Sequence, residues 1–290
     1  MHDNFLSVLL GIIEGLTEFL PVSSTAHLRI SEALLGIDLS NGFWKMYSIV
    51  IQLGAILCLP LYFRSRIAKF LRTFPHGERH DRTALTHPLT LVMLAVVLTA
   101  GPAFLLTKVI GKHLESLTVM GWSLLVGGIV MWVVDALFGT PRPGSRHQTE
   151  RMEEMTPLQA AWIGICQIAS AVFPGTSRSM STIAAGQLAG MSRPSALEFS
   201  FFLSMPTMAA ATLYDLFKTL HAKAGAEPLG RMPGSGHEWL VLAIGFVVSF
   251  IVALAVVAWF MNWVRQRGFT PFAIYRIVIG IAVLVWVARG

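Results

Sequence analysis

The sequence predicts an all-α polytopic membrane protein with six transmembrane helices and two re-entrant helical hairpins. Three observations carry this prediction. Hydrophobic residues make up 54% of the 290 residues and charged residues only 13%, about half the charged share of soluble domains. Apolar runs long enough to cross a bilayer recur along the chain, and Lys and Arg gather between them. This composition excludes an ordinary soluble enzyme, a disordered chain and a fibrous repeat.

Six segments reach the length of about 20 apolar residues that a helix needs to cross the hydrocarbon core. They are residues 43–63, 88–106, 118–138, 195–213, 238–264 and 271–288. Two other apolar regions, 5–30 and 158–190, are interrupted near their middle by proline and a run of small polar residues. Irregular backbone within a membrane is tolerated only where protein buries it or water reaches it. We therefore expect each region to form a hairpin of two short helices that enters the membrane and returns.

The distribution of basic residues orients these segments. The loop 64–87 is rich in Lys and Arg, which predicts a cytoplasmic location. Counting crossings from this loop places both termini and the loop 214–237 outside. The first hairpin then enters from outside and the second from the cytoplasm.

The two hairpins are related by a constant shift along the chain. A shift of 153 residues (174 − 21) places Pro21 on Pro174 and Ser24 on Ser177. The same shift brings the three spans of the first half close to those of the second. Because three crossings is an odd number, the halves must run in opposite directions. The sequence therefore predicts one membrane domain, 1–290, built from inverted repeats at about 1–140 and 155–290.

A new helix is expected to begin after each interruption. Ser23 or Ser24 can cap the first of these helices, and Thr176 or Ser177 the second. In an inverted repeat the two helix N-termini converge, and their free N–H groups and positive partial charge suit an anion, phosphate above all. Gly175 would let backbone approach such a ligand. Serine-rich turns are also common as plain caps, and alone they favour that simpler explanation.

Ionisable residues beside the interruptions favour a functional site. Glu14 and Glu18 share one helix face, and a charge near the bilayer centre costs at least about 2.5 kcal/mol. They therefore require a partner, a cation or water. His27 follows Ser24 by one helical turn, and Arg178 brings a guanidinium, which matches phosphate oxygens, to the second interruption. The alternative is that Arg178 only pairs structurally with one of the glutamates.

The two halves differ in these residues. The 153-residue shift places Gln167 and Ala171 at the positions of the two glutamates, and Arg178 at the position of Thr25. One half thus supplies the carboxylates and histidine, and the other supplies the cation. A phosphoryl-transfer site needs such a division between reacting groups and a charge clamp. Other charges within apolar runs are explained as structural pairs or snorkelling side chains: Asp135, Glu198, Asp215 and Arg276.

Several runs of residues resemble a known family. The segment 14–27, EGLTEFLPVSSTAH, is similar to the first signature of the undecaprenyl-diphosphate phosphatases, the bacitracin-resistance family. The segment 174–179, PGTSRS, together with Thr182, is similar to the second. Segments 51–54, 198–201 and 271–276 add to a likeness that covers nearly the whole chain. Ala26 and Met180 depart from the family, which commonly has glycine at both positions.

The resemblance implies hydrolysis of undecaprenyl diphosphate to undecaprenyl phosphate and inorganic phosphate. This reaction recycles the lipid carrier of peptidoglycan synthesis, and it implies bacitracin resistance, a bacterial plasma membrane and a divalent cation, Mg²⁺ or Ca²⁺. The active-site residues that it implies by position are Glu14, Glu18, Ser24, His27, Ser177, Arg178 and Thr182.

Together, the residues and the resemblance define the predicted site. The catalytic set is Glu14, Glu18, Ser24, His27 and Arg178, with Glu14 and Glu18 also as the cation ligands. The substrate-binding set is Ser23, Thr25, Gly175, Thr176, Ser177, Arg178, Ser179 and Thr182. Three routes stay open: attack by Ser24, attack by His27, or a water activated by His27. The expected partners are undecaprenyl diphosphate and membrane lipids, nucleic acid is not expected, and the sequence leaves a homodimer open.

The main alternative function is a transporter or a polyprenyl-lipid flippase. Inverted repeats with broken helices that meet at the bilayer midplane are a transporter architecture. This alternative explains the architecture, but an anion carrier needs no carboxylate pair beside its anion site. A second class, the lipid phosphatases that resemble soluble acid phosphatases, needs a histidine soon after Ser-Arg. The next histidine after Arg178 is His221, and this class is therefore set aside.

Overall fold

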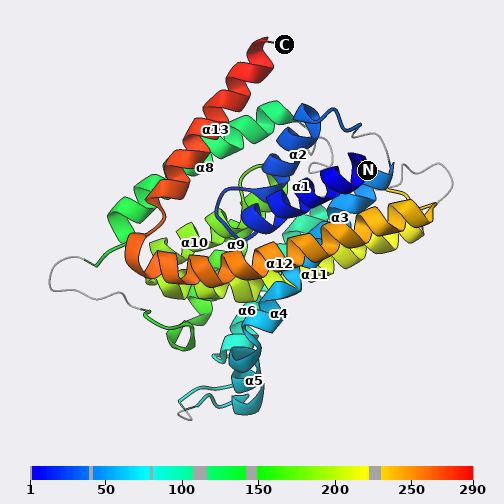
Figure 1. Cartoon of the computed structure of the whole chain (residues 1–290). Helices are drawn as coiled ribbons and strands as arrows, with labels where there is room; N and C mark the ends of the chain where they lie inside the picture. The colour runs from blue at the N-terminus through cyan, green and yellow to red at the C-terminus, as the bar shows by residue number, and fades with distance from the viewer. Residues whose placement is uncertain are drawn as a thin grey trace. The chain divides into compact units, whose positions relative to one another are not determined.

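The computed structural model describes residues 2–38, 42–78, 81–106, 116–141, 149–221 and 230–289. These residues form α-helices joined by turns and one short 3₁₀ turn, η1 (Met152–Glu154), and they contain no β-strand (Figure 1). A single isolated bridge joins Thr149 to Met191. The predicted all-α class is therefore confirmed.

Six helices within the described residues are long and apolar enough to cross a membrane. Their bounds are Gly42–Ile56 (α3) continued by Cys58–Tyr62 (α4), Pro88–Leu105 (α6), Leu117–Phe138 (α8), Arg193–Leu220 (α11), Gly236–Arg267 (α12) and Thr270–Arg289 (α13). These are the six predicted spans. The largest difference lies in α11, which extends seven residues beyond the predicted end (220 − 213 = 7).

Two pairs of shorter helices occupy the regions predicted as hairpins. The pairs are α1 (His2–Thr17) with α2 (Ser24–Leu34), and α9 (Pro157–Val172) with α10 (Arg178–Leu188). The first helix of each pair has 16 residues and the second has 11. At 1.5 Å per residue, 16 residues span about 24 Å, less than the roughly 30 Å of a hydrocarbon core. The equal lengths are what a repeat requires, while membrane entry and the inverted relation stay predictions.

Local sequence signals explain where several helices begin. Thr156 and Gln159 form a capping box at the start of α9, where each side chain accepts a hydrogen bond from the other residue's backbone N–H. The hydroxyl of Ser116 caps α8 by accepting from Val119 N. The ring of His87 caps α6. These caps satisfy N–H groups that no helical carbonyl can reach.

The chain divides into two compact units. Unit 1 comprises Met1–Phe19, Ser24–Tyr62 and Ser204–Ala258, and unit 2 comprises Leu20–Ser23, Phe63–Leu203 and Trp259–Gly290. Both hairpin turns, residues 18–23 and 173–177, thus have residues in unit 2, which also holds α5 (Arg64–Thr73), α6, α8, α9, α10 and α13. Neither unit coincides with a half of the predicted repeat.

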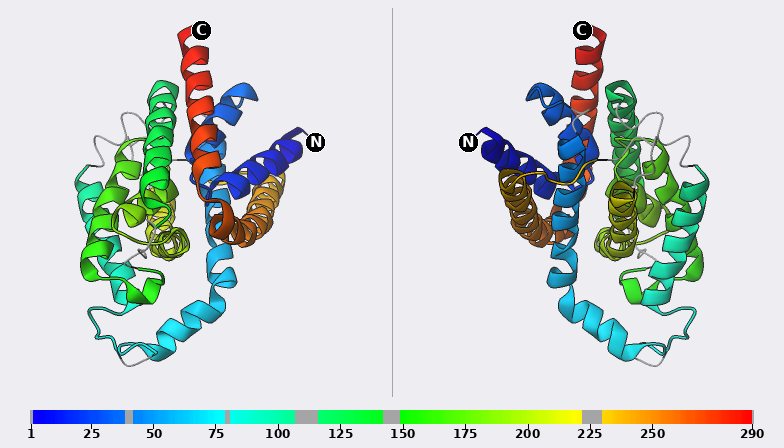
Figure 2. Two further views of the ribbon diagram at one scale, coloured as in Figure 1. Left: turned by 90° about the vertical axis from the view of Figure 1, so that its left-hand side faces the viewer. Right: turned by 90° about the vertical axis from the view of Figure 1, so that its right-hand side faces the viewer.

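In unit 1, α1 runs beside α12 at close range (Figures 1 and 2). A Cβ atom added to Gly15 would lie 2.7 Å from Cβ of Val252, so only glycine permits this approach. Ser7 on α1 donates to the carbonyl of Val241 on α12 at 2.6 Å and lies 3.0 Å from the hydroxyl of Tyr47 on α3. Buried apolar side chains around these contacts form the core of unit 1.

In unit 2, α8 and α13 pack side by side (Figure 2). Gly128 and Gly280 lie at this contact, and a Cβ on Gly280 would reach 2.7 Å from the backbone N of Leu125. Asp135 on α8 accepts from Arg193 at 2.7 Å, from Gln187 at 2.9 Å and from the backbone N–H of Phe269 at 3.0 Å. Asp135 therefore connects four elements of unit 2, which confirms its predicted role as a structural pair.

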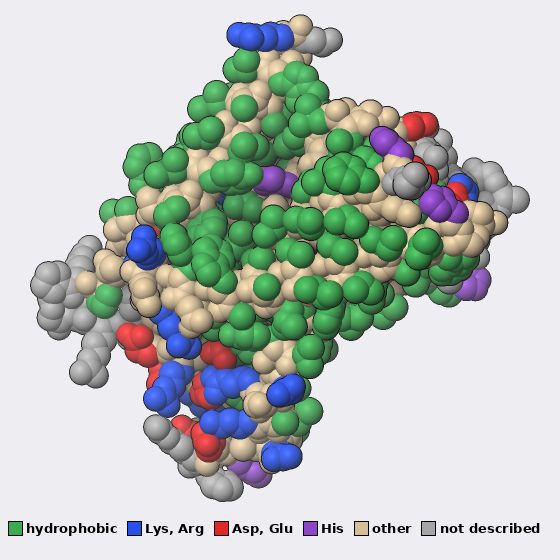
Figure 3. Space-filling view, viewed as in Figure 1, with side chains coloured by type: hydrophobic (Ala, Val, Ile, Leu, Met, Phe, Trp, Pro, Cys, Tyr) green, Lys and Arg blue, Asp and Glu red, His purple; other side chains and the backbone are tan. Residues whose placement is uncertain are grey.

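Charged side chains of unit 2 gather around α5 (Figure 3). Arg66 donates to both oxygens of Glu153 and, at 2.7 Å, to Glu198 on α11. The predicted structural role of Glu198 is thereby confirmed. Burial acts to raise the pKa of Glu153, but hydrogen bonds from Arg66, a backbone hydrogen bond and the charges of Arg66 and Lys69 together hold that pKa below its ordinary value.

Candidate functional site

The first part of the predicted site lies in unit 1, where α1 ends and α2 begins. Glu14 is in the last turn of α1 and Glu18 is the first residue beyond it. Both carboxylates are buried, with Glu14 0% and Glu18 6% exposed. Ser24 is the first residue of α2 and is also buried, and His27 follows one turn later with partial exposure. The structure thus brings the glutamates, the serine and the histidine of the first signature to one end of a helix pair.

A short hydrogen bond joins two of these groups. The hydroxyl of Ser24 donates to Oε2 of Glu18 at 2.5 Å, within the range of hydrogen bonds from a hydroxyl to a carboxylate. The two residues are six positions apart, and the turn between α1 and α2 allows them to meet. A hydroxyl that donates to a carboxylate has the geometry expected of a nucleophile beside its general base.

The position of the glutamates suits a cation. The C-terminal end of a helix carries a partial negative charge, so two carboxylates there are electrostatically unfavourable unless positive charge compensates them. No basic residue lies in the last turn of α1. Mg²⁺ is commonly held by one or two carboxylates together with substrate phosphates. The described residues contain no group of three or more His, Cys, Asp and Glu side chains that could hold a metal alone, and Glu14 and Glu18 fit the two-carboxylate pattern.

The second part of the predicted site lies in unit 2 and consists of the two turns. Ser23 and Ser177, each directly before a helix, adopt left-handed backbone conformations with φ of 76° and 70°. This conformation is rare for residues other than glycine and concentrates at functional sites. Gly175 also has a positive φ, 91°, and a Cβ there would lie 2.9 Å from the backbone of Met120 on α8. Gly175 therefore lets the second turn approach α8 closely, and its predicted approach to a ligand stays a prediction.

Side-chain hydrogen bonds hold the start of α10. The hydroxyl of Ser177 caps this helix by accepting from Met180 N at 3.3 Å, as predicted. Ser179 donates to the carbonyl of Leu20 in the first turn at 3.0 Å. The hydroxyl of Thr182 lies 2.7 Å from that of Ser200 on α11. Ser179 and Thr182 thus fix α10 in place and join it to its neighbours in unit 2.

The remaining predicted residues differ in their exposure. Arg178 is the first residue of α10 and is partly buried, as is Thr176 in the turn before it. Thr25, in the first turn of α2, is exposed.

Sequence reasoning missed the role of Arg276. We predicted a snorkelling side chain or a structural ion pair, but Arg276 is 0% exposed and forms no ion pair with a described carboxylate. Its guanidinium donates to the backbone carbonyls of Pro21, Ser123, Gly175 and Thr176. The only sequence signal was an arginine within an apolar span. Backbone carbonyls are present in every residue, so the sequence could not identify them as its partners.

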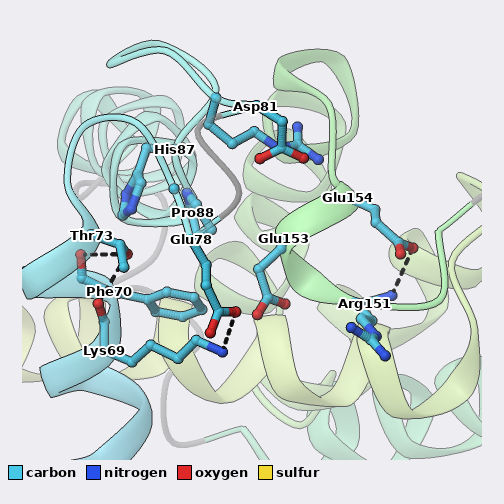
Figure 4. A pocket seen from close by; sticks show the side chains of 12 residues that line it. Lys69, Phe70, Thr73, Glu78, Asp81, His87, Pro88, Arg151, Glu153 and Glu154 are labelled. Atoms are coloured by element: carbon cyan, nitrogen blue, oxygen red, sulfur yellow. Dashed lines mark hydrogen bonds and ion pairs between the residues drawn. The ribbon is translucent and has the colours of Figure 1, made fainter.

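Unit 2 also contains a pocket that no predicted site residue lines and a groove that only one of them, Thr176, lines. One, of about 60 Å³, is formed by polar side chains around α5, where Lys69 pairs with Glu78 at 2.6 Å (Figure 4). Burial lowers the pKa of His87 in this pocket, and the positive charge of Arg82 lowers it further. A lower pKa favours the neutral ring, whose Nδ1 can accept the hydrogen bond from Leu89 N at the start of α6. The other, of about 530 Å³, is an apolar groove along α8, α9 and α10 that reaches Thr176.

Comparisons with known proteins identify the family. A family model described as bacitracin resistance protein BacA matches residues 7–282. The chain belongs to the BacA family. It is 66% identical over 291 aligned residues, and over the whole of both chains, to an undecaprenyl-diphosphatase of Koribacter versatilis. It is 40% identical to one of a Bradyrhizobium species, covering 100% of this chain and 99% of that one. A third relative, from Caldanaerobacter subterraneus, is 38% identical over 97% of this chain and 95% of its own length. The resemblance seen in the two signatures is therefore confirmed.

The contact between Ser24 and Glu18 generates a prediction about this BacA family site. Ser24→Ala and Glu18→Gln should each lower kcat on undecaprenyl diphosphate by about 10² or more, the contribution of a general base. Groups that act as a unit are not additive, so the double variant should be no slower than Ser24→Ala alone. Steady-state phosphate release from the three variants measures this. Ser7→Ala removes another buried hydroxyl of unit 1 and should retain the wild-type kcat per folded protein. A Glu18→Gln variant with wild-type kcat would show that the hydrogen bond has no catalytic role.

Proposed function

We propose that this chain hydrolyses undecaprenyl diphosphate to undecaprenyl phosphate and inorganic phosphate, and so recycles the lipid carrier of peptidoglycan synthesis. One observation carries the proposal: a buried serine donates to a buried carboxylate at a helix start. It occurs in a chain 66% identical over its full length to a protein named undecaprenyl-diphosphatase. Bacitracin resistance follows from the same activity, since the family carries that name.

The proposed chemistry begins at Ser24. Glu18 accepts the proton of the Ser24 hydroxyl as Oγ attacks the terminal phosphorus. The new Oγ–P bond forms while the bond from that phosphorus to the bridging oxygen breaks, and undecaprenyl phosphate leaves. Water then attacks the phosphoserine and gives up a proton to His27. The Oγ–P bond breaks, Glu18 returns its proton to Oγ of Ser24, and inorganic phosphate leaves. The short contact between Ser24 and Glu18 favours this route over attack by His27.

The turns and Arg178 are proposed to hold the phosphates. Backbone N–H groups at the starts of α2 and α10 and the Ser177 hydroxyl are assigned as donors, and Arg178 supplies a planar, bidentate cation. Residues Ser23, Thr25, Gly175, Thr176, Ser179 and Thr182 build the backbone that carries these donors. A divalent cation held by Glu14 and Glu18 would neutralise charge on the phosphate oxygens.

The alternative, a transporter or flippase, rests on the predicted inverted repeat. A carrier needs no nucleophile with a base, so it leaves the contact between Ser24 and Glu18 without a purpose. Enzymatic turnover distinguishes the two functions.

Purified protein in detergent should release inorganic phosphate from a polyprenyl diphosphate with multiple turnovers. A chelator should abolish this release and added Mg²⁺ or Ca²⁺ should restore it, because the proposed cation neutralises charge on the phosphate oxygens. Glu14→Gln should raise the cation concentration required for half-maximal rate. Absence of phosphate release by folded wild-type protein with either cation would exclude the proposed hydrolysis, and unchanged release in chelator would exclude the cation.

Substitution of Arg178 tests the proposed phosphate clamp. Lysine keeps the charge but loses the bidentate fork, so Arg178→Lys should lower kcat by roughly 10², as loss of one oxyanion donor does. Its melting temperature in detergent should stay close to that of wild type. A variant within about threefold of the wild-type kcat, a barrier difference of about 0.65 kcal/mol, would remove the clamp from the mechanism.

We also propose a bacterial plasma-membrane location with both termini outside, on the basis of the basic loop 64–87. A Cβ atom added to Gly236 would meet no other atom within 4 Å, and Ala84 is exposed. A cysteine can therefore replace either residue. In a background with Cys58→Ala and Cys166→Ala, an impermeant maleimide should label Gly236→Cys in intact cells and Ala84→Cys only after lysis. The opposite labelling pattern would invert the proposed orientation.

A further inference from the structure

Arg276 occupies an unusual position within unit 2. It lies in the apolar helix α13 with 0% of its surface exposed. Within the described residues no carboxylate pairs with it, and its Nε has no hydrogen-bond partner. Burial of an unpaired cation is costly in apolar surroundings, so a residue kept there requires a specific reason.

The hydrogen bonds of Arg276 go to the two turns. Nη1 donates to the carbonyl of Pro21 at 3.2 Å in the first turn. Nη2 donates to the carbonyls of Gly175 at 3.1 Å and Thr176 at 2.9 Å in the second turn, and to Ser123 of α8 at 3.0 Å. One guanidinium therefore joins both turns and α8 through backbone atoms alone.

These bonds fix which way the second turn presents its polar groups. The C=O and N–H of a trans peptide point in opposite directions. Because the Thr176 carbonyl points at Arg276, the N–H of Ser177 points away from it. A carbonyl oxygen that pointed at a bound anion would repel it. In this structure the carbonyl oxygens of Pro21, Gly175 and Thr176 point at the guanidinium of Arg276 instead.

Space for the guanidinium comes from α8. A Cβ atom on Gly127 would overlap Nη2 of Arg276 and lie 2.9 Å from Cε of Met180. Glycine at 127 thus permits the position of the guanidinium, and alanine there would displace it without removing its charge.

We propose that Arg276 is a positioning residue for the phosphate site. It holds the carbonyls of Pro21 and Gly175, whose peptide N–H groups donate within their own turns, and it holds the Thr176 carbonyl on its own side, so that the N–H of Ser177 faces the diphosphate. The uncompensated charge of its guanidinium also favours binding of an anion at the turns. This inference rests on the proposed function. It differs from the assignment of Arg178, because Arg276 acts through backbone atoms and touches no substrate.

The test compares wild type with Arg276→Lys, Arg276→Met and Gly127→Ala, with activity expressed per monodisperse protein in detergent. An ammonium cannot span four carbonyls, so Arg276→Lys should lose at least about tenfold in kcat, comparable to loss of a preorganised donor. Gly127→Ala should lose kcat in the same direction with all charges kept. Gly121→Ala is the matched control, since its Cβ would meet Leu284 across the same helix pair, 2.9 Å from Cγ, and would not reach the guanidinium. It should keep the wild-type kcat.

A second readout does not depend on turnover. Inorganic phosphate should raise the melting temperature of wild type and of Gly121→Ala, and should raise that of Arg276→Met much less. A purely structural Arg276 predicts lower melting temperatures with unchanged kcat and unchanged stabilisation by phosphate.

The outcomes separate this inference from the proposed function. An inactive wild type contradicts the proposed function itself. An active wild type, with Arg276→Lys or Gly127→Ala within twofold of its kcat and equally stabilised by phosphate, overturns the positioning role. If the Arg276 variants fail to fold, Gly127→Ala decides by the same two measurements.

Discussion

The fold depends on satisfying backbone polar groups where helices stop inside an apolar protein. Each turn of the predicted hairpins leaves carbonyl and N–H groups without helical partners, and lipid supplies none. Arg276 satisfies carbonyls of both turns, and Ser179 satisfies that of Leu20. The left-handed conformations at Ser23 and Ser177 persist because these surrounding bonds hold the turns.

The charges of the candidate site follow the helix ends. The carboxylates of Glu14 and Glu18 lie where α1 ends, at the negative pole of its dipole, while Arg178 begins α10 at a positive pole. Each charge thus has the same sign as the helix end that carries it, which stabilises neither helix. In the proposed diphosphatase, a cation beside the glutamates and a phosphate beside the arginine would bring charge of the opposite sign to each of these helix ends.

Close helix packing makes room for these polar groups. Gly15 lets α1 approach α12 in unit 1, and Gly127 admits the guanidinium of Arg276 in unit 2. In an apolar medium helices gain from van der Waals contact and interhelical hydrogen bonds more than from hydrophobic burial. Small residues at these contacts therefore position the site as well as stabilise the fold.

The sequence alone determined the all-α class, the six spans and the residues of the two signatures, because apolar length and charge placement act locally along the chain. It also determined that Glu14 lies near Glu18 and that Ser24 lies near His27, since residues three or four apart on a helix are neighbours. Only the tertiary structure decided that Ser24 donates to Glu18, that Gly175 lies against α8, and that Arg276 binds carbonyls. These depend on how the chain turns and on backbone atoms that every residue carries, so residue identity could not reveal them.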